Sequence, residues 1–294
     1  MTLEQLRIFV AVAEREHVTR ASEALHLTQS AVSAAVAALE AQYDTRLFDR
    51  VGRRIELTSA GHIFLEEARA VLVRASSAEL ALSELGSLER GAINIHASLT
   101  VASYWLPARL ARFHLAHPGI RLHVSVGNTR EVTDAVLAGQ ADIGFVEGEI
   151  DAPALSLAPI GEDRLMLVAS PEHPLALKEV VELADLQSAS WILREQGSGT
   201  RSELAARLKA LGLEPDAFRV ALELPSVEAV RAAIQAGAGI GGISNLSAEP
   251  AIKLGALAPV GPSLPPRPFH VLRHRERRPS RAAETLVSLC REAY

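Results

Sequence analysis

From Gly91 onward the sequence alternates short apolar runs with amphipathic segments, and few folds are compatible with so regular a succession. The runs with strand character are INIH, RLHVSV, ADIGFVE, RLMLVAS, SWILRE, FRVALEL and GIGGIS. Helical patterns separate them near residues 107–115, 131–138, 202–211 and 227–236. Strands that alternate with helices in this way predict parallel sheets with helical crossovers, and therefore an α/β fold.

The alternating region contains two such series. The chain passes from the first to the second near Ile160-Gly161 and returns near the proline-rich segment PSLPPRP. We therefore expect two α/β lobes, with lobe I formed by about residues 91–160 and 267–294 and lobe II by about 161–266. Open α/β sheets usually bind ligands in a crevice, so we expect a ligand in the cleft between these lobes.

The residues before position 59 predict a small helical domain. Thr2 and Gln5 form a capping-box start for a first helix, and Thr19 is placed to cap a second. Thr28 is placed to cap a third helix after the short break HLT. Two short helices joined by such a turn make a helix-turn-helix. The outer face of the third helix is then expected to carry Gln29, Ser30 and Ser33.

The segment RLFDRVGRRIELT places Gly52 between two runs of strand character, which predicts a hairpin, or wing, with arginines at its tip. The formal net charge of the chain is −5, and this sum argues against a nucleic-acid partner. Locally, however, one acid, Asp49, is surrounded by four arginines, namely Arg46, Arg50, Arg53 and Arg54. A winged helix-turn-helix and an ordinary three-helix domain with a solvated basic loop both stay open.

A heptad pattern follows, in which apolar residues step by four and three alternately at Phe64, Ala68, Val71, Ala75, Ala78, Leu82 and Leu85. Such a pattern predicts a long linker helix that pairs with its copy in another subunit. The alternative is a helix that packs on its own domain. The many small residues in the pattern favour close approach of two helices, and we expect a dimer or a dimer of dimers.

In order along the chain, ASEALHLTQSAVSAAVAALE and RLFDRVGRRIELTSAG resemble the DNA-binding signature of LysR-type transcription regulators. ADIGFVEG, ILREQGSGTR and SVEAVRAAIQAGAGIGGIS resemble their effector domain. ILREQGSGTR and FVEG are most similar to the branch of Calvin-cycle regulators and activators of sulfur-assimilation genes, with a sulfite-sensing regulator as the nearest likeness. This resemblance implies a winged helix-turn-helix at residues 1–58, a linker helix at 59–89 and a periplasmic-binding-protein-like effector domain at 90–294.

By this resemblance, double-stranded DNA is contacted by Thr28, Gln29, Ser30 and Ser33 of the third helix and by Arg50, Arg53 and Arg54 of the wing. The sequence departs from the common family pattern at two places. Ala34-Ala35 stands where many members carry an arginine after the serine of the recognition helix. Tyr43-Asp44 stands where a glycine often precedes the wing. Both departures affect the expected operator preference and leave the fold unchanged.

Two segments, ASLT at residues 97–100 and GSGT at residues 197–200, each end a strand and open a helix. Unpaired N–H groups at a helix start, hydroxyls and close-approaching glycines suit an anion. Serine and threonine at such junctions are more often simple caps. The resemblance favours an effector site, whose residues would be Ser98, Leu99, Thr100, Gly197, Ser198, Gly199 and Thr200. Since neither segment contains a lysine, we expect helix dipoles to meet the charge.

Glu147 in FVEG ends a strand and is expected to face the same cleft. A carboxylate there conflicts with a pure anion. It either orients the hydroxyls or accepts a hydrogen bond from a protonated or amine-bearing ligand, and a surface glutamate is the plain alternative. Sulfite is the first candidate ligand by resemblance, followed by sulfate-like and short carboxylate ligands.

Other chemistry finds little support. Ser198 lies outside a G-x-S-x-G elbow, and the pairs His114/His117 and His270/His274 have no third metal ligand at a telling spacing. Cys290 is the single cysteine, which agrees with a reducing cytoplasm, and we read it as an inert thiol. The first residues do not resemble a signal peptide, and no apolar run is long enough for a membrane span.

We therefore expect a cytoplasmic, ligand-responsive DNA-binding protein with no catalytic residues, metal or cofactor. The rival hypothesis is a cytoplasmic α/β solute-binding or enzymatic protein that carries an unrelated helical domain at its N-terminus.

Overall fold

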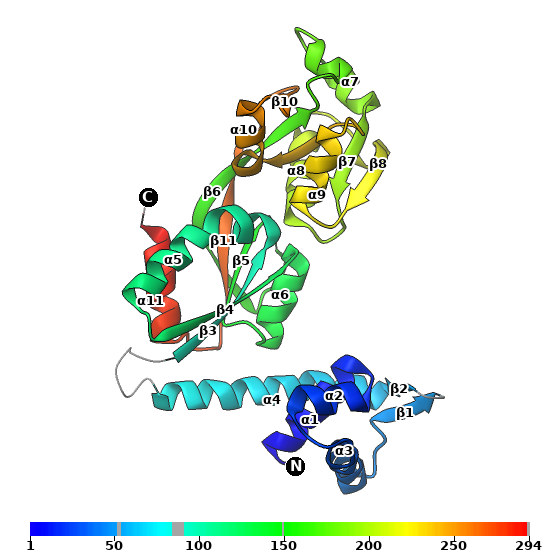
Figure 1. The fold of residues 1–294 in the computed structure, drawn as a ribbon, viewed down its shortest axis with the longest axis vertical. Coiled ribbons are helices and arrows are strands. Elements are labelled where there is room, and N and C mark those ends of the chain that lie inside the picture. The colour runs from blue at the N-terminus through cyan, green and yellow to red at the C-terminus, as the bar shows by residue number, and fades with distance from the viewer. Residues whose placement is uncertain (52–53, 84–90, 149, 293–294) are drawn as a thin grey trace. The chain divides into compact units, whose positions relative to one another are not determined.

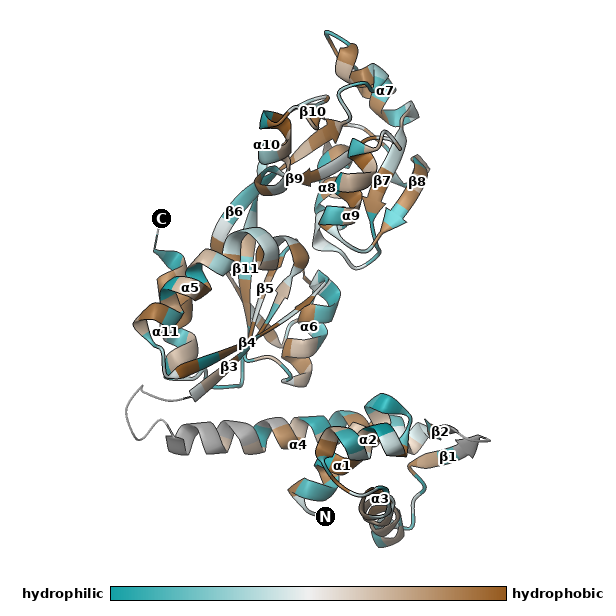
Figure 2. Cartoon of the chain, in the orientation of Figure 1, coloured by the Kyte–Doolittle hydropathy of each residue, from teal (hydrophilic) through white to brown (hydrophobic). Residues whose placement is uncertain are grey.

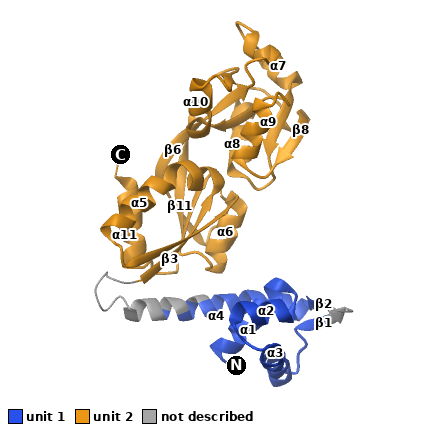
Figure 3. Cartoon of the chain, viewed as in Figure 1, with its two compact units in different colours: residues 1–86 blue, residues 87–294 orange. Residues whose placement is uncertain are grey.

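The computed structural model describes residues 1–51, 54–83, 91–148 and 150–292 of the chain. The chain folds into two compact units, residues 1–86 and residues 87–294 (Figure 3). The hydropathy colouring differs among their elements, since α2 of the first unit is largely teal whereas the strands of the second unit carry brown (Figure 2).

The first unit contains three short helices, a two-stranded hairpin and a long helix (Figure 1). These are α1 (Leu3–Arg15), α2 (Val18–Leu25), α3 (Gln29–Tyr43), β1 (Phe48–Val51), β2 (Arg54–Leu57) and α4 (Ser59–Ser83). The predicted capping box at Thr2 and Gln5 is present, and Thr28 Oγ1 accepts from the backbone N–H of Ala31, as predicted. Thr19 as the cap of α2 is wrong, because α2 already begins at Val18 and its cap is His17, whose Nδ1 accepts from the Arg20 N–H.

The core of the first unit is built around Phe9 of α1, whose ring lies 5.4 Å from that of Phe48 and 4.8 Å from that of Phe64. Ala68 of α4 is buried in the same core. The first two heptad residues of α4 therefore pack on α1, which corrects the expectation that the whole pattern faces another subunit. Val71 is 40% exposed and Ala78 is exposed, so these two heptad residues do not pack in the core of the described unit.

One carboxylate joins the third helix to the hairpin. Glu40 of α3 accepts through Oε1 from the backbone N–H groups of Leu47 (2.7 Å) and Phe48 (3.1 Å). These are charge-assisted bonds, which are stronger than neutral ones. They fix the chain where it leaves α3 and enters β1.

In the second unit, the lobe I sheet has the order β6-β11-β5-β3-β4. Its strands are β3 (Gly91–Ser98), β4 (Ile120–Gly127), β5 (Ile143–Glu147), β6 (Leu155–Ala169) and β11 (Pro266–His274). The helical elements of this lobe are the π-helix η1 (Val101–Trp105), α5 (Leu106–Ala116), α6 (Thr129–Ala138) and α11 (Arg281–Arg291). Only β3 pairs in parallel with β4 and β5, whereas β11 is antiparallel to β5 and β6. The sheet is therefore mixed: the expected parallel pairing is present between β3 and its two neighbours, and the antiparallel strand β11 corrects the expectation of a parallel sheet for the rest.

Lobe II is built on the second half of β6, which pairs with β9 and β10, and on the parallel pair β7-β8. Its strands are β7 (Ser190–Arg194), β8 (Arg219–Leu224), β9 (Gly241–Ser244) and β10 (Ala258–Pro259). Its helices are η2 (Pro174–Leu177), α7 (Leu183–Ser188), α8 (Gly199–Ala210), η3 (Pro215–Ala217), α9 (Val227–Gln235) and α10 (Asn245–Lys253).

The two lobes have separate cores and share two strands. Phe145 and Phe269 pack around Trp105 in lobe I, whereas the rings of Trp191 and Phe218 stack at 4.5 Å in lobe II. The strands β6 and β11 run together from one lobe to the other (Figure 1). Side chains at this crossing lie where the cleft was expected.

Candidate functional site

The third helix of the first unit presents a polar surface at its start. The side chains of Gln29, Ser30 and Ser33 are exposed, while Val32 is buried. Thr28 holds the helix start and lies 3.1 Å from Ser30 through the two hydroxyl oxygens. Since no described residue covers these three side chains, they are available to meet the edges of bases in a DNA groove.

The wing is an antiparallel hairpin in which Phe48 pairs with Leu57 and Val51 with Arg54. Arg50 belongs to β1 and Arg54 to β2, whereas Arg53, the third predicted wing contact, lies outside the described residues.

In lobe I the ASLT segment joins strand to helix without a loop. Ser98 is the last residue of β3, and the chain turns helical at once at Leu99 and Thr100 before the π-helix. Ser98 and Thr100 are buried, and Leu99 is half-buried. The expected strand-to-helix junction is present, and it directs two hydroxyl-bearing residues into the interior of the second unit.

In lobe II the GSGT segment opens α8. Gly197 has a φ of 89°, a left-handed conformation that favours glycine, and α8 begins two residues later at Gly199. Thr200 and Ser198 are buried. The Ser198 hydroxyl has no hydrogen-bond partner among the described residues. A buried polar atom without a partner costs free energy, so a ligand atom that hydrogen-bonds to this hydroxyl would remove that cost.

Glu147 brings these segments together in one hydroxyl cluster, which we define as Ser98, Thr100 and Thr200 around the Glu147 carboxylate. Ser98 donates to Glu147 Oε2, and Thr200 Oγ1 donates to Glu147 Oε1 at 3.0 Å. Thr100 and Thr200 lie 3.4 Å apart through their hydroxyl oxygens. Glu147 is 1% exposed, so it is not a surface residue. The chain's own carboxylate thus takes hydrogen bonds that an anion would need.

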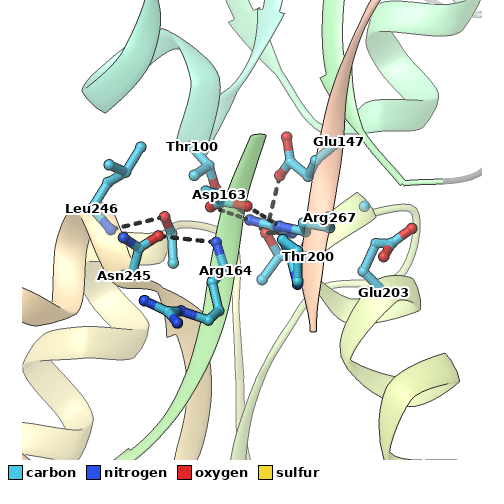
Figure 4. A network of polar contacts seen from close by, with 12 residues as sticks. Thr100, Glu147, Asp163, Arg164, Thr200, Glu203, Asn245, Leu246 and Arg267 are labelled. Atoms are coloured by element: carbon cyan, nitrogen blue, oxygen red, sulfur yellow. Dashed lines mark hydrogen bonds and ion pairs between the residues drawn. The ribbon is translucent and has the colours of Figure 1, made fainter. Parts of the chain in front are cut away.

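An ion pair that the sequence analysis did not single out adjoins the cluster (Figure 4). Arg267 of β11 donates through Nε and Nη2 to the two carboxylate oxygens of Asp163 on β6, at 2.6 and 3.0 Å. Its Nη1 donates to Thr200 Oγ1 at 3.2 Å. Both charged side chains are 0% exposed. The expectation that helix dipoles alone would meet a ligand's charge therefore omitted a buried guanidinium.

Next to the cluster lies an open hollow of about 750 Å³ between α6 and α8. Gly197, Ser198 and Gly199 line it, together with Arg130 and Arg201. Ser98, Thr100, Glu147 and Thr200 do not line it, because they lie on the buried side of the GSGT segment. A ligand that reaches the cluster must therefore displace or separate residues that now contact one another.

The first unit and the second unit each match a known family. Residues 3–62 match the model of the bacterial regulatory helix-turn-helix protein, lysR family, and residues 86–294 match the LysR substrate binding domain. The chain belongs to the LysR family of transcriptional regulators. The two-lobed α/β domain and the winged helix-turn-helix predicted from the sequence are thereby confirmed.

Among LysR-family relatives, the chain is 38% identical over 292 residues to the uncharacterized HTH-type transcriptional regulator YeiE of Escherichia coli, covering 99% of this chain and 97% of that one. It is 33% identical over 245 residues to the HTH-type transcriptional regulator CysL of Bacillus subtilis, covering 83% and 81%. It is 32% identical over 259 residues to a probable RuBisCO transcriptional regulator of Trichormus variabilis, covering 87% and 77%. The last two agree with the branch that the effector motifs resemble.

A solved structure gives the same answer for the fold. The crystal structure of full-length CbnR complexed with its target DNA is 26% identical, has a TM-score of 0.71 and is matched over 99% of both chains. The family and the relatives are transcriptional regulators, so the rival hypothesis of an enzyme with an unrelated helical domain is wrong.

Neither a metal-binding group nor Cys290 contributes to this site in the described part of the chain. No group of three His, Cys, Asp or Glu side chains suited to a metal ion occurs among the described residues. Cys290 is buried in the lobe I core, and burial raises the pKa of its thiol to about 11. Within the described part of the chain, no helix has the length and apolar character needed to cross a membrane.

Proposed function

We propose that this LysR-type regulator responds to a small oxyanion, with sulfite the first candidate, bound at the hydroxyl cluster between lobes I and II. The observation that carries the proposal is that Thr100 of lobe I and Thr200 of lobe II place their hydroxyls 3.4 Å apart. Helix starts at both residues add N–H dipoles that favour negative charge. The unpaired hydroxyl of Ser198 in the same GSGT segment supports it.

Glu147 selects among such ligands. Its buried carboxylate accepts hydrogen bonds only, so a ligand that keeps a proton can donate to it, whereas a fully ionised dianion is repelled. Affinity for sulfite is therefore expected to fall as pH rises and the ligand loses its proton. The same carboxylate also suits an amine-bearing ligand, which is the second candidate class.

Titration calorimetry of the full chain with sulfite, sulfate and a small amine tests the ligand class. Thr100→Ala and Thr200→Ala each remove one hydroxyl and are expected to weaken sulfite binding by about 10-fold, the usual effect of losing a hydrogen bond to a charged group. Unchanged binding in both variants would remove the cluster from consideration. Binding of the amine without any oxyanion would replace the ligand class.

In this proposal residues 1–58 bind double-stranded DNA in the bacterial cytoplasm, residues 59–89 join subunits and residues 90–294 bind the effector. A second copy of the chain as partner is supported by the exposed Val71 and Ala78 of α4, which continue the heptad beyond the residues packed on α1. Leu82 and Leu85 belong to the same heptad, but the Leu82 side chain and all of Leu85 lie outside the described residues. Effector binding shifts the population of regulator states only as far as it prefers one of them.

A further inference from the structure

We infer that Arg267 is the cationic ligand of the oxyanion, and that Asp163 limits its charge so that the site selects singly charged over doubly charged oxyanions. This inference rests on the proposed oxyanion function and names residues of the same site. Arg267 and Asp163 lie directly opposite each other on β11 and β6, the strands that cross between the lobes.

The geometry leaves one edge of the guanidinium for another partner. Asp163 engages Nε and Nη2, and the remaining nitrogen, Nη1, is directed at Thr200 Oγ1. A guanidinium has five N–H donors, and the described contacts of Arg267 use three of them. The Nη1 donor of Arg267 therefore points to Thr200, whose hydroxyl lies beside that of Thr100, and an oxyanion there would receive hydroxyl and guanidinium hydrogen bonds together (Figure 4).

Stability alone gives little reason for this pair. Removing two charges from water is costly, and well-packed apolar residues often stabilise a protein as well as a buried ion pair does. Both side chains are fully buried beside apolar strand residues, and yet the guanidinium is retained at the hydroxyl cluster. Because this guanidinium is already desolvated and held in place, an anion that reaches the cluster does not bear the cost of desolvating and ordering it.

The charges within the site set which anion fits. One guanidinium, Arg267, faces two carboxylates, Asp163 and Glu147, around the same Thr200 hydroxyl. Arg207 also interacts electrostatically with Arg267 and Asp163, but its guanidinium is paired with Glu203. A second negative charge on the ligand would therefore meet no unpaired cation, and an unpaired buried charge is strongly unfavourable. Asp163 therefore works against sulfate-like dianions while leaving the directed Nη1 donor for a monoanion.

Calorimetry of the full chain tests the role of Arg267 and Asp163. Sulfite and sulfate are compared at one pH, chosen so that sulfite keeps a proton and carries a single charge. The double variant Asp163→Gln with Arg267→Gln removes the charges together, so no buried charge is left unpaired, and it is expected to weaken sulfite binding by at least about 10-fold. The control is Arg112→Gln with Glu292→Gln, which removes an exposed ion pair of lobe I whose residues belong neither to the cluster nor to the lining of the hollow. The control is expected to bind sulfite as the unmodified chain does.

A second variant keeps the test decisive where the double variant does not fold. Asp163→Asn leaves Arg267 charged and only partly neutralised, so it is expected to tighten sulfate binding by about 10-fold and to narrow the difference between sulfate and sulfite. Either of two results overturns the role of the ion pair and leaves the oxyanion function in place. One is sulfite binding retained within two-fold in a folded double variant, and the other is sulfate binding that Asp163→Asn does not improve. A wild-type chain that binds neither anion overturns the oxyanion function together with this inference.

Discussion

A Cβ atom on Gly199, the first residue of α8, would lie 1.9 Å from the backbone carbonyl oxygen of Glu147 at the end of β5. Because α8 belongs to lobe II and β5 to lobe I, the lobes meet here backbone to backbone. Thr129 joins them, since its hydroxyl accepts from the Gly199 N–H at 3.1 Å and donates to the Glu147 carbonyl at 2.9 Å. The absence of a side chain at Gly199 therefore sets how closely the lobes approach beside the hydroxyl cluster.

Gly199→Ala is expected to separate the lobes and lower the melting temperature of the second unit by about 2–12 °C, because overpacking costs about 1–3 kcal/mol in a unit of this size. Effector affinity is expected to fall with it. Gly91→Ala is the matched control, since a Cβ there meets no atom within 4 Å. Calorimetric melting of both variants gives the comparison, and equal melting temperatures would show that the contact yields without cost.

Val71→Glu is expected to disrupt the subunit contact made by α4, because it places a charge among the heptad residues that α1 leaves uncovered. Val71 is 40% exposed in the described chain and would be buried by a second helix. Ala70→Glu adds the same charge at an exposed neighbouring position outside the heptad and is expected to leave assembly intact. Light scattering reads the molar mass, and an unchanged mass in Val71→Glu would place the subunit contact elsewhere.

Gln29→Ala is expected to relax sequence choice, because an exposed amide at the start of α3 is suited to a base edge and such a contact contributes about 1–3 kcal/mol of discrimination. Arg53→Ala in the wing is expected instead to weaken all DNA about equally and to reduce the salt slope by about 1. Fluorescence titrations with specific and scrambled duplexes at several salt concentrations separate the two effects. Equal loss of specificity in both variants would contradict this division of roles.

Cys290 is expected to resist alkylation in the folded protein at neutral pH. Burial raises the pKa of its thiol to about 11, while Arg109 acts weakly in the opposite direction, and only the thiolate reacts. The rate is expected to rise about tenfold per pH unit up to about pH 11, and to be far higher after unfolding, where the pKa is about 8.5. Since folding raises this pKa, the thiol's stabilising contribution is full below about pH 8.5 and is lost as pH rises toward 11. Intact-mass measurement of iodoacetamide-treated protein follows the reaction, and rapid modification at pH 7 would contradict the reading of Cys290 as an inert thiol.

Local signals predicted the parts of this fold that depend on neighbouring residues. The capping box at Thr2 and Gln5 and the cap at Thr28 involve residues three positions apart, so the sequence displays them directly. The cap of α2 was missed because His17 is an uncommon cap and Thr19 a common one. The expectation of parallel sheets was correct for β3, β4, β5, β7 and β8. It missed the antiparallel strand β11, which returns from the far end of the sequence to pair with β5 and β6.

The buried charges were beyond the reach of motif reasoning, because Arg267 and Asp163 are separated by 104 residues. A weaker signal was nevertheless present. Arg267 shares the period-two face of its strand with the buried Phe269 and Val271, and Asp163 shares its own with Leu165 and Leu167. A charge on the inward face of a strand predicts a buried partner, although it does not say which residue that is.

The two hydrogen bonds that Glu40 accepts at the start of the wing affect which DNA shapes this regulator fits. One carboxylate of α3 holds the backbone at Leu47 and Phe48. This contact fixes the distance between α3 and the start of the wing. A helix and a wing held at a fixed distance fit only those duplexes whose groove width and curvature bring bases and phosphates to the matching separation. We therefore expect operators to differ in affinity also through the stiffness of base steps that no side chain touches, since deforming a poorly fitting duplex costs free energy.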